Sequence, residues 1–264
     1  MASRRMWGEG GEPIRFPYPG FPWSNMRRFA IGDIHGCGKA LRTLVTEISP
    51  DADDQLVFLG DYVDRGPDSR DVVDQILELQ TRAEVIPLRG NHEIMLLGVA
   101  AGTCDPDLWL RSGGQATLAS YGGSIDRIPA EHIAFLESTL RLHESESEIF
   151  VHAMYREDLE MQKQAEETLF WEHLPDPLPG PHFSGKRVVL GHTPQPGGEI
   201  LLTPHLVCLD TYCFGGGYLS AMNLDDQSVI QVNRQGHVRR VPIAFLWAAL
   251  VRLRAKFLTG RRAN

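Results

Sequence analysis

The sequence predicts an α/β fold in which central β-sheets are flanked by helices. Short apolar runs recur from residue 29 onward, and each ends at a Gly or polar cluster. The runs are FAI (29–31), LVFL (56–59), VIPL (85–88), IFV (149–151), VVL (188–190) and LVCL (206–209). Continuous runs of this length are typical of strands buried on both faces. Between the early runs, apolar residues recur at helical spacing over 40–48 and 72–79, which indicates parallel strand–helix–strand units.

The chain of 264 residues divides into three parts. Residues 1–26 are rich in Gly, Pro and aromatics, and because each Pro fixes φ and removes a donor, they predict an N-terminal arm without a regular helix. Residues 27–240 hold all the apolar runs and predict one domain. Within it, 102–145 is expected to form a helical cap without strands, and 218–232 a hairpin around Asp225-Asp226.

The C-terminal segment, 241–264, joins an apolar stretch to a basic one. One interpretation is a basic amphipathic helix for a membrane surface or an acidic partner. The other is a helix packed on the parent domain, with its cations near its carboxyl end, where the helix dipole favours them. The apolar stretch from Val241 to Val251 is too short for the ~20 residues of a membrane span.

Composition narrows the class of function. Hydrophobic residues make up 42% and charged residues 23%, which is an ordinary globular balance. The net charge of −8 argues against nucleic acid as a general partner, since that binding depends on Lys and Arg. The four cysteines form no Cys-x-x-Cys pair and no disulfide framework, and no apolar signal region follows the first residues, so we expect a cytoplasmic protein.

Five of the runs are followed by a segment that supplies metal-binding residue types. The segments are GDIHG, GDYVDRG, RGNHE, HA and GHT, and they supply Asp33, His35, Asp61, Asn91, His152 and His192. The carboxyl ends of strands are where an open α/β sheet binds ligands. Oxygen and imidazole donors without thiolate suit Mn²⁺, Fe or Zn²⁺. Six ligands exceed the need of one catalytic ion, so we expect two, about 3.5–4 Å apart, bridged by a carboxylate.

Together these segments resemble the phosphoprotein phosphatase (PPP) family of calcineurin-like metallophosphoesterases, from about Phe29 to about Arg234. The single VHA and the stretch SGKRVVLGHTPQ look more like bacterial serine/threonine phosphatases than eukaryotic ones. The resemblance implies a calcineurin-like sandwich. It also implies that one ion is held by Asp33, His35 and Asp61, and the other by Asp61, Asn91, His152 and His192.

The same resemblance assigns roles around the ions. Arg65 and Asn91 are expected to bind the substrate phosphate, and His92, paired with Asp64, to protonate the leaving group. The implied reaction is direct attack on phosphorus by a hydroxide that bridges two divalent ions, with Mn²⁺ as the leading expectation and Fe or Zn²⁺ as alternatives. The leading function is hydrolysis of phosphomonoesters, foremost phosphoserine or phosphothreonine in proteins. The alternative is hydrolysis of diadenosine tetraphosphate or a related nucleotide polyphosphate. Oligomeric state is not readable from the sequence.

A second phosphate-binding arginine is harder to place. Bacterial members often carry it in a Trp-x-Arg pattern, but here Trp171 is followed by Glu172 and His173. Arg156 is the favoured substitute, because it follows a strand end that already delivers a ligand, and Arg111 on the cap is the other candidate.

Three further residues lie inside the motifs. Arg89 could contact phosphate but is expected to form a structural ion pair. Glu93 is expected to orient backbone. Cys37 is expected to fill space rather than to sense redox state.

Overall fold

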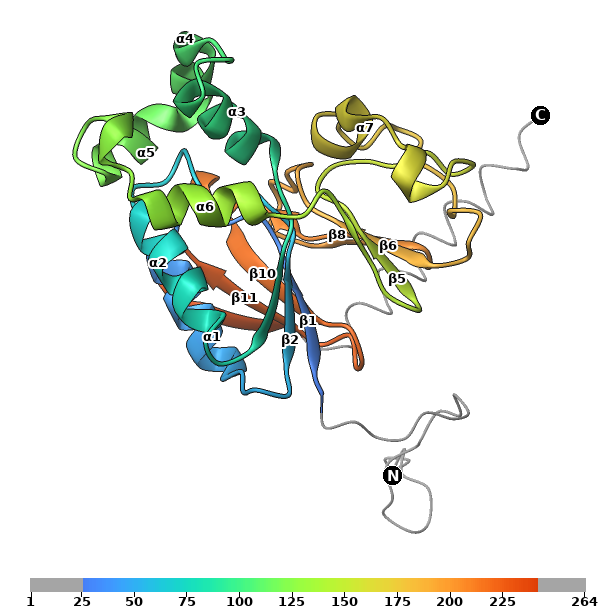
Figure 1. Cartoon of the computed structure of the whole chain (residues 1–264). Coiled ribbons are helices and arrows are strands. Elements are labelled where there is room, and N and C mark those ends of the chain that lie inside the picture. Colours follow the sequence, from blue (N-terminus) through green and yellow to red (C-terminus); the bar gives the residue numbers. More distant parts are fainter. Residues whose placement is uncertain (1–25, 242–264) are drawn as a thin grey trace, which may run out of the picture.

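The computed structural model describes residues 26–241 (Figure 1). Apart from Met26 and Val241, the predictions for the N-terminal arm and the C-terminal helix therefore lie outside the described residues. Within the described part, no helix is long and apolar enough to cross a membrane.

The first sheet is mixed. In the described residues it has seven strands, in the order β12 (Val238–Val241), β11 (Val229–Asn233), β10 (Tyr218–Asn223), β1 (Arg28–Ile31), β2 (Gln55–Phe58) and β3 (Glu84–Pro87), with β9 (Asp210–Thr211) paired to β10 outside this path. Strands β1, β2 and β3 are parallel, with Ala30 opposite Val57 and Val57 opposite Ile86. Strand β10 returns antiparallel to β1 and forms the predicted hairpin with β11.

The second sheet has five strands in the described residues, in the order β4 (His143–Glu144), β5 (Glu148–Phe150), β6 (Arg187–Leu190), β8 (Leu206–Cys208) and β7 (Leu201–Leu202). Strands β5, β6 and β8 are parallel. All six apolar runs thus form strands, as predicted. They belong to two sheets, however, and the short strand β4 lies in the segment 102–145 that was expected to hold none.

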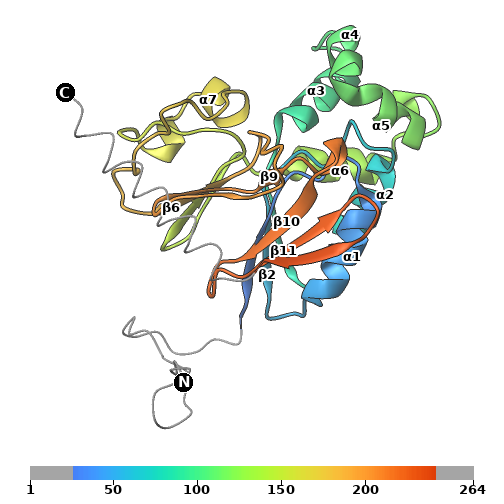
Figure 2. The same ribbon diagram turned by 180° about the vertical axis from the view of Figure 1, so that it is seen from behind.

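The two sheets pack face to face with helices outside, which confirms the predicted sandwich. Side chains alternate along each strand, so Ala30 and Val57 pack against Val189 of the second sheet, while Leu56 faces the other way and shares a core with Leu41 of α1. Helices α1 (Gly38–Ile48) and α2 (Ser69–Leu79) cover this outer face (Figure 1), and the view from behind shows β11 beside α1 (Figure 2). Burial on both faces explains why the runs are continuously apolar.

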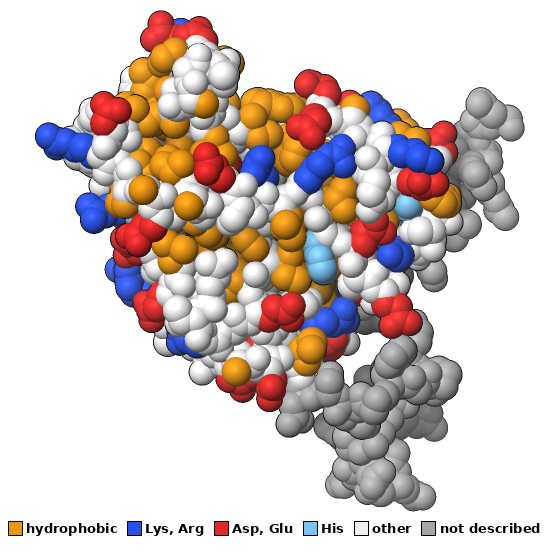
Figure 3. All heavy atoms as spheres, in the orientation of Figure 1, with side chains coloured by type: hydrophobic (Ala, Val, Ile, Leu, Met, Phe, Trp, Pro, Cys, Tyr) orange, Lys and Arg blue, Asp and Glu red, His pale blue; other side chains and the backbone are white. Residues whose placement is uncertain are grey.

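The remaining helices lie around the carboxyl ends of the strands. They are α3 (Asn91–Ala100), α4 (Pro106–Trp109), η1 (Leu110–Gly114), α5 (Gln115–Ser120), η2 (Ile125–Arg127), α6 (Ala130–Ser138), η3 (Met161–Lys163), α7 (Glu166–Phe170) and η4 (Cys213–Gly215). Elements α4 to α6 form the predicted cap. Apolar side chains gather over it at the upper left of Figure 3. Leu108 of α4 is 48% exposed.

Candidate metal centre

Five of the six predicted ligands lie in the loops that leave β1, β2, β5 and β6, and Asn91 begins helix α3 after the loop that leaves β3. Three of these strands belong to the first sheet and two to the second, so the site forms where the sheets meet. The chain turns sharply there. Of eight non-glycine residues with positive φ in the described part, five belong to the predicted site: His35 (45°), Asp61 (53°), Asp64 (71°), Arg65 (67°) and His192 (60°). Such conformations cost on the order of 1–3 kcal/mol each and are found at functional sites.

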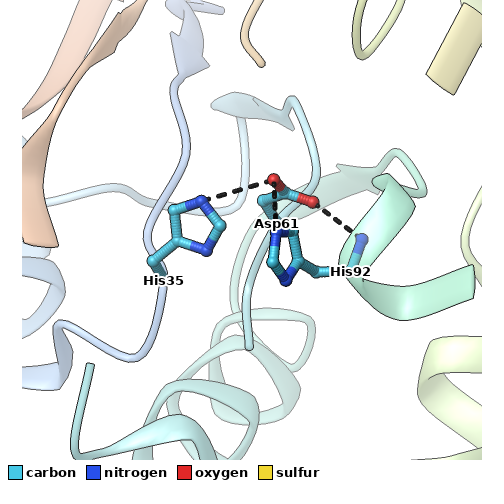
Figure 4. Close-up of side chains that lie close together, drawn as sticks. All are labelled: His35, Asp61 and His92. Carbon is cyan, nitrogen blue, oxygen red and sulfur yellow. Dashed lines mark hydrogen bonds and ion pairs between the residues drawn. The ribbon is translucent and has the colours of Figure 1, made fainter. Parts of the chain in front are cut away.

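Asp61 lies at the centre of the cluster. Its Oδ2 is 3.3 Å from Nε2 of His35, and its Oδ1 is 3.5 Å from Nε2 of His152. Two groups of candidate ligand atoms share it, one with His35 and His92 and one with His152 and His192 (Figure 4 shows the first). Burial alone would raise the pKa of Asp61, but the surrounding imidazoles, His152 foremost, hold that pKa well below its usual range. Asp61 is therefore the carboxylate that both candidate groups share, as the predicted bridging role requires.

The ligand imidazoles are oriented by backbone carbonyls. Nδ1 of His35 donates to the carbonyl oxygen of Val63 at 3.0 Å, and Nδ1 of His152 donates to that of Leu59 at 2.7 Å. Nε2 of each ring then faces Asp61 as an acceptor. Burial lowers the pKa of both rings, which favours the neutral form that binds metal.

The last two predicted ligands complete the second group. Burial lowers the pKa of His192 to about 3, so this ring is neutral too. Its Nε2 donates to the carbonyl oxygen of Trp171 at 3.2 Å, which leaves Nδ1 as the acceptor. Oδ1 of Asn91 lies 3.1 Å from Nε2 of His152, so the amide oxygen faces the same point as the ring.

Two buried carboxylates show that cations fit here. Oδ1 of Asp33 and Oδ2 of Asp210 have no hydrogen-bond partner among the described residues. Burial and the nearby carboxylates of Asp210 and Asp61 raise the pKa of Asp33 well above its usual value. Burial also raises the pKa of Asp210 to about 6. Crowded carboxylates with free oxygens beside neutral imidazoles are the donor set that divalent cations prefer.

Glu93 orients backbone, as expected. It is fully buried, and its two oxygens accept hydrogen bonds from the backbone N–H groups of Asp61 (2.9 Å), Tyr62 (2.8 Å), Val63 (3.4 Å) and Gly90 (2.8 Å). Burial raises its pKa to about 7. One side chain thus joins the loop after β2 to the loop after β3, and it holds Asp61 in its left-handed conformation.

His92 differs from the ligand imidazoles in its protonation. Its Nδ1 donates to Oδ2 of Asp64 at 2.7 Å. Burial lowers its pKa, but Asp61 and Asp64 outweigh burial and raise the pKa above the ordinary value. The raised pKa favours the protonated ring, which donates from both nitrogens and does not bind a metal, so His92 fits a proton donor better than a ligand, although it lies within reach of His35 and Asp61.

The cap supplies two partners of Asp64 that the sequence analysis missed. Nε1 of Trp109 donates to the Asp64 carboxylate at 2.9 Å, and Oγ1 of Thr117 donates to it at 2.6 Å. Both side chains are buried. The only signal in the sequence was a Trp and a Thr in a helical segment some 50 residues downstream, which no short motif marks. The cap therefore helps to hold the carboxylate that orients His92.

Arg65 is an exposed cation at the edge of the cluster. Its guanidinium lies 4.6 Å above the ring of Phe214, and its Nη1 lies 2.8 Å from Nε2 of His35. The cap holds its backbone, since Arg65 N–H donates to the carbonyl oxygen of Gly113 at 3.1 Å. This position suits the predicted contact with a substrate phosphate.

The other predicted cations are placed less favourably. Arg156 donates to both oxygens of Glu172, at 2.7 and 2.8 Å, so its guanidinium is already paired. Arg111 is exposed on η1. His173 stacks on His192, with ring centroids 4.5 Å apart. Phosphate binding by Arg156 stays a prediction.

Arg89 forms no ion pair among the described residues. It donates instead to the carbonyl oxygens of Glu137 and Thr139, at 2.6 and 3.2 Å, at the end of α6. The expected structural role holds, but through helix capping rather than through a carboxylate.

Candidate metal donors gathered around Asp61, beside an exposed arginine and the imidazole of His92 that Asp64 orients, fit a metal-dependent phosphoesterase. Comparison with known proteins agrees. The chain belongs to the calcineurin-like phosphoesterase family, whose model matches residues 26–225. The family implies divalent metal ions, without fixing which metal.

Individual relatives have narrower descriptions. A symmetrical bis(5'-nucleosyl)-tetraphosphatase of Janthinobacterium sp. (strain Marseille) is 29% identical over 279 residues, which cover 80% of this chain and 98% of that protein. A relative with the same description in Burkholderia thailandensis is 44% identical over only 80 residues, 30% of this chain and 28% of its own length. The crystal structure of a candidate diadenosine tetraphosphatase aligns with a TM-score of 0.59 at 25% identity, covering 78% of this chain and 92% of that one.

Proposed function

We propose that this protein hydrolyses dinucleoside tetraphosphates symmetrically, splitting diadenosine tetraphosphate into two molecules of ADP. The observation that carries the proposal is the similarity to the Janthinobacterium tetraphosphatase over 98% of that protein's length. The similar solved structure of a candidate diadenosine tetraphosphatase supports it. These relatives favour the alternative reading of the sequence over the leading one, a serine/threonine protein phosphatase.

The reaction adds one water across the central anhydride. The water oxygen bonds to one of the two middle phosphorus atoms, the P–O bond to the bridging oxygen breaks, and that oxygen leaves with the second ADP. Two divalent ions, when bound, supply positive charge and an acidified water. Asp33, His35, Asp61, Asn91, His152 and His192 are the residues that would hold them.

The remaining site residues act on the phosphates. Arg65 can neutralise charge on the phosphoryl oxygens, because its guanidinium contacts the Phe214 ring and Nε2 of His35 but forms no ion pair among the described residues. The raised pKa of His92 favours a proton on Nε2 that the ring can share with the leaving oxygen, while Asp64 holds its Nδ1. Asp64 in turn is held by Trp109 and Thr117, so the donor is fixed before substrate arrives.

Product analysis tests the proposal. The purified chain with Mn²⁺ is incubated separately with diadenosine tetraphosphate and with a phosphoserine peptide, and the products are separated by ion-exchange chromatography. We expect ADP as the sole nucleotide product and a much lower kcat/KM on the peptide. ATP plus AMP as products would contradict symmetrical cleavage. Preferential turnover of the peptide would instead support a serine/threonine protein phosphatase, the leading function expected from the sequence. An Asp61→Asn variant purified in parallel controls for contaminating phosphatase.

A further inference from the structure

A cavity of about 520 Å³ lies beside Arg65 and outside the predicted ligand set. Its volume is within the ~300–1,000 Å³ typical of small-molecule sites. Four segments line it: the start of α1, the loop before α2, helix α5 of the cap and the region around η4 with the β11–β12 turn. The residues that matter most are Arg65, Asp68, Ala116, Ala119, Phe214 and Arg234. Because Arg65 belongs to both, the cavity adjoins the place where phosphate is expected.

Phe214 connects two cations of this cavity. Its ring lies 4.6 Å beneath the guanidinium of Arg65, and its carbonyl oxygen accepts a hydrogen bond from Nη1 of Arg234 at 3.3 Å. Neither arginine forms an ion pair within residues 26–241, although arginines nearby do, such as Arg240 with Glu47. Two guanidiniums without an ion pair that line one cavity favour a ligand with more than one phosphate.

The rest of the lining favours a ligand larger than inorganic phosphate. Asp68 contributes a partly exposed carboxylate, and no described residue donates a hydrogen bond to it. A carboxylate repels phosphate but accepts hydrogen bonds from hydroxyl groups. Ala116 and Ala119 present small side chains on the cap wall, which leaves the space open. The cavity therefore combines phosphate-binding cations with a hydroxyl acceptor.

We infer that this cavity binds the departing nucleoside diphosphate, with Arg234 contacting its phosphates and Asp68 its ribose hydroxyls. The inference rests on the proposed function and names the part of the site that would distinguish a nucleotide anhydride from a simple phosphomonoester. A small aryl phosphate ends at Arg65 and the metal centre. A dinucleoside tetraphosphate extends beyond them, and the cavity receives the extension.

Arg234→Ala is the first test, with Arg240→Ala as the matched control. Both remove one exposed arginine from the last two strands and their turn, but Arg240 does not line the cavity. We expect Arg234→Ala to lower kcat/KM for diadenosine tetraphosphate about 10- to 100-fold, as a lost charged hydrogen bond does. The loss on para-nitrophenyl phosphate should be at least tenfold smaller, and Arg240→Ala should match the parent on both. Equal losses on the two substrates, or equal behaviour of the two variants, would overturn the inference.

Binding of ADP gives a readout independent of turnover. Calorimetric titration of the full chain with ADP should show weaker binding in Arg234→Ala than in Arg240→Ala. Asp68→Ala should weaken binding of ADP but not of inorganic diphosphate, which has no ribose. Asp68 caps no backbone N–H of α2, so the substitution leaves the helix start intact. If Asp68→Ala weakens both ligands equally, the ribose contact is wrong.

Failure of the proposed function is distinguishable from failure of this inference. If the parent does not split diadenosine tetraphosphate but binds ADP through Arg234, the function is wrong and the nucleotide cavity stands. If the parent produces ADP while both arginine variants behave alike, the function stands and the cavity assignment falls.

Discussion

The contact between the cap and Asp64 can be tested by Thr117→Val, which removes a hydroxyl with little change of shape. Oγ1 of Thr117 donates to Oδ1 of Asp64 at 2.6 Å and accepts from the Asp64 backbone N–H at 2.9 Å, and the side chain is fully buried. The backbone N–H keeps a second acceptor, Oγ of Ser69 at 3.1 Å. The substitution therefore removes one hydrogen bond to a charged group, about 1.5–3 kcal/mol, and also the 2.9 Å hydrogen bond between Oγ1 of Thr117 and Oγ of Ser69.

That loss is a sizeable part of the roughly 5–15 kcal/mol that stabilises a typical domain. Urea unfolding of the metal-free chain measures it as a lower midpoint at unchanged slope. Thr117→Ser is the control, because it keeps the hydroxyl and loses only a methyl group, at a cost of about 0.5–1.5 kcal/mol. The Thr117→Val variant should also hydrolyse the phosphoserine peptide more slowly than the Thr117→Ser variant, because Thr117 holds Asp64 and Asp64 orients His92. If Val and Ser variants are equally stable and equally active, the cap does not support Asp64 in the way the geometry indicates.

Further predictions concern the metals, the proton donor, the sheet interface and the first residues. Chelation should abolish hydrolysis of para-nitrophenyl phosphate and added Mn²⁺ should restore it; full turnover by metal-free protein would contradict the two-metal site. His92→Asn should slow hydrolysis of a phosphoserine peptide about 10²-fold or more and slow para-nitrophenyl phosphate less, because its leaving group is a weaker base. Burial alone would raise the pKa of Glu148, but its hydrogen bonds to two serines and its ion pair with Arg28 lower it below the usual value. A lowered pKa in the folded state stabilises the fold at pH values above the unfolded-state pKa of about 4.3, and this stabilisation is lost as the pH falls through the folded-state pKa. Glu148→Gln should therefore lower the free energy of unfolding at pH 7 and lower it progressively less towards pH 3, as measured by urea unfolding. A chain that begins at Met26 should fold and hydrolyse small phosphates, since Arg27 keeps its contacts with Asp54; an insoluble product would place the preceding residues in the core.

The strands were predictable because each carries its own local signal. The runs around Ala30, Val57 and Val189 are apolar at every position, and this pattern arises only when both faces of a strand are covered. The same pattern hides which sheet a strand joins. A continuous run does not distinguish a helix on one side from a second sheet, so the division of the ligand strands into three and two was not readable.

The site residues, like the strands, were predictable only where a local sequence signal marked them. Residues next to a strand end, such as Asp61, were found because position along the chain determines position at the sheet edge. Residues brought in from afar were not found. Trp109 and Thr117 reach Asp64 across 45 and 53 positions. Asp210 follows the sixth run without a neighbouring Gly-His or Asn-His pair, so nothing local marked it as part of the cluster.

The pairing of β1 with β10 has a consequence for how the protein is made. Ala30 lies opposite Met222, and Gly32, next to Asp33, donates its backbone N–H to Ser220 at 3.0 Å. A ribosome that adds about 5–20 residues per second needs on the order of 10–40 s to travel between these partners. During that time the nascent chain carries β1 with one open edge, while the strands of the second sheet emerge and can pair among themselves. The first sheet, which carries Asp33, His35 and Asp61 at its strand ends, is therefore completed late, when the C-terminal hairpin pairs with β1.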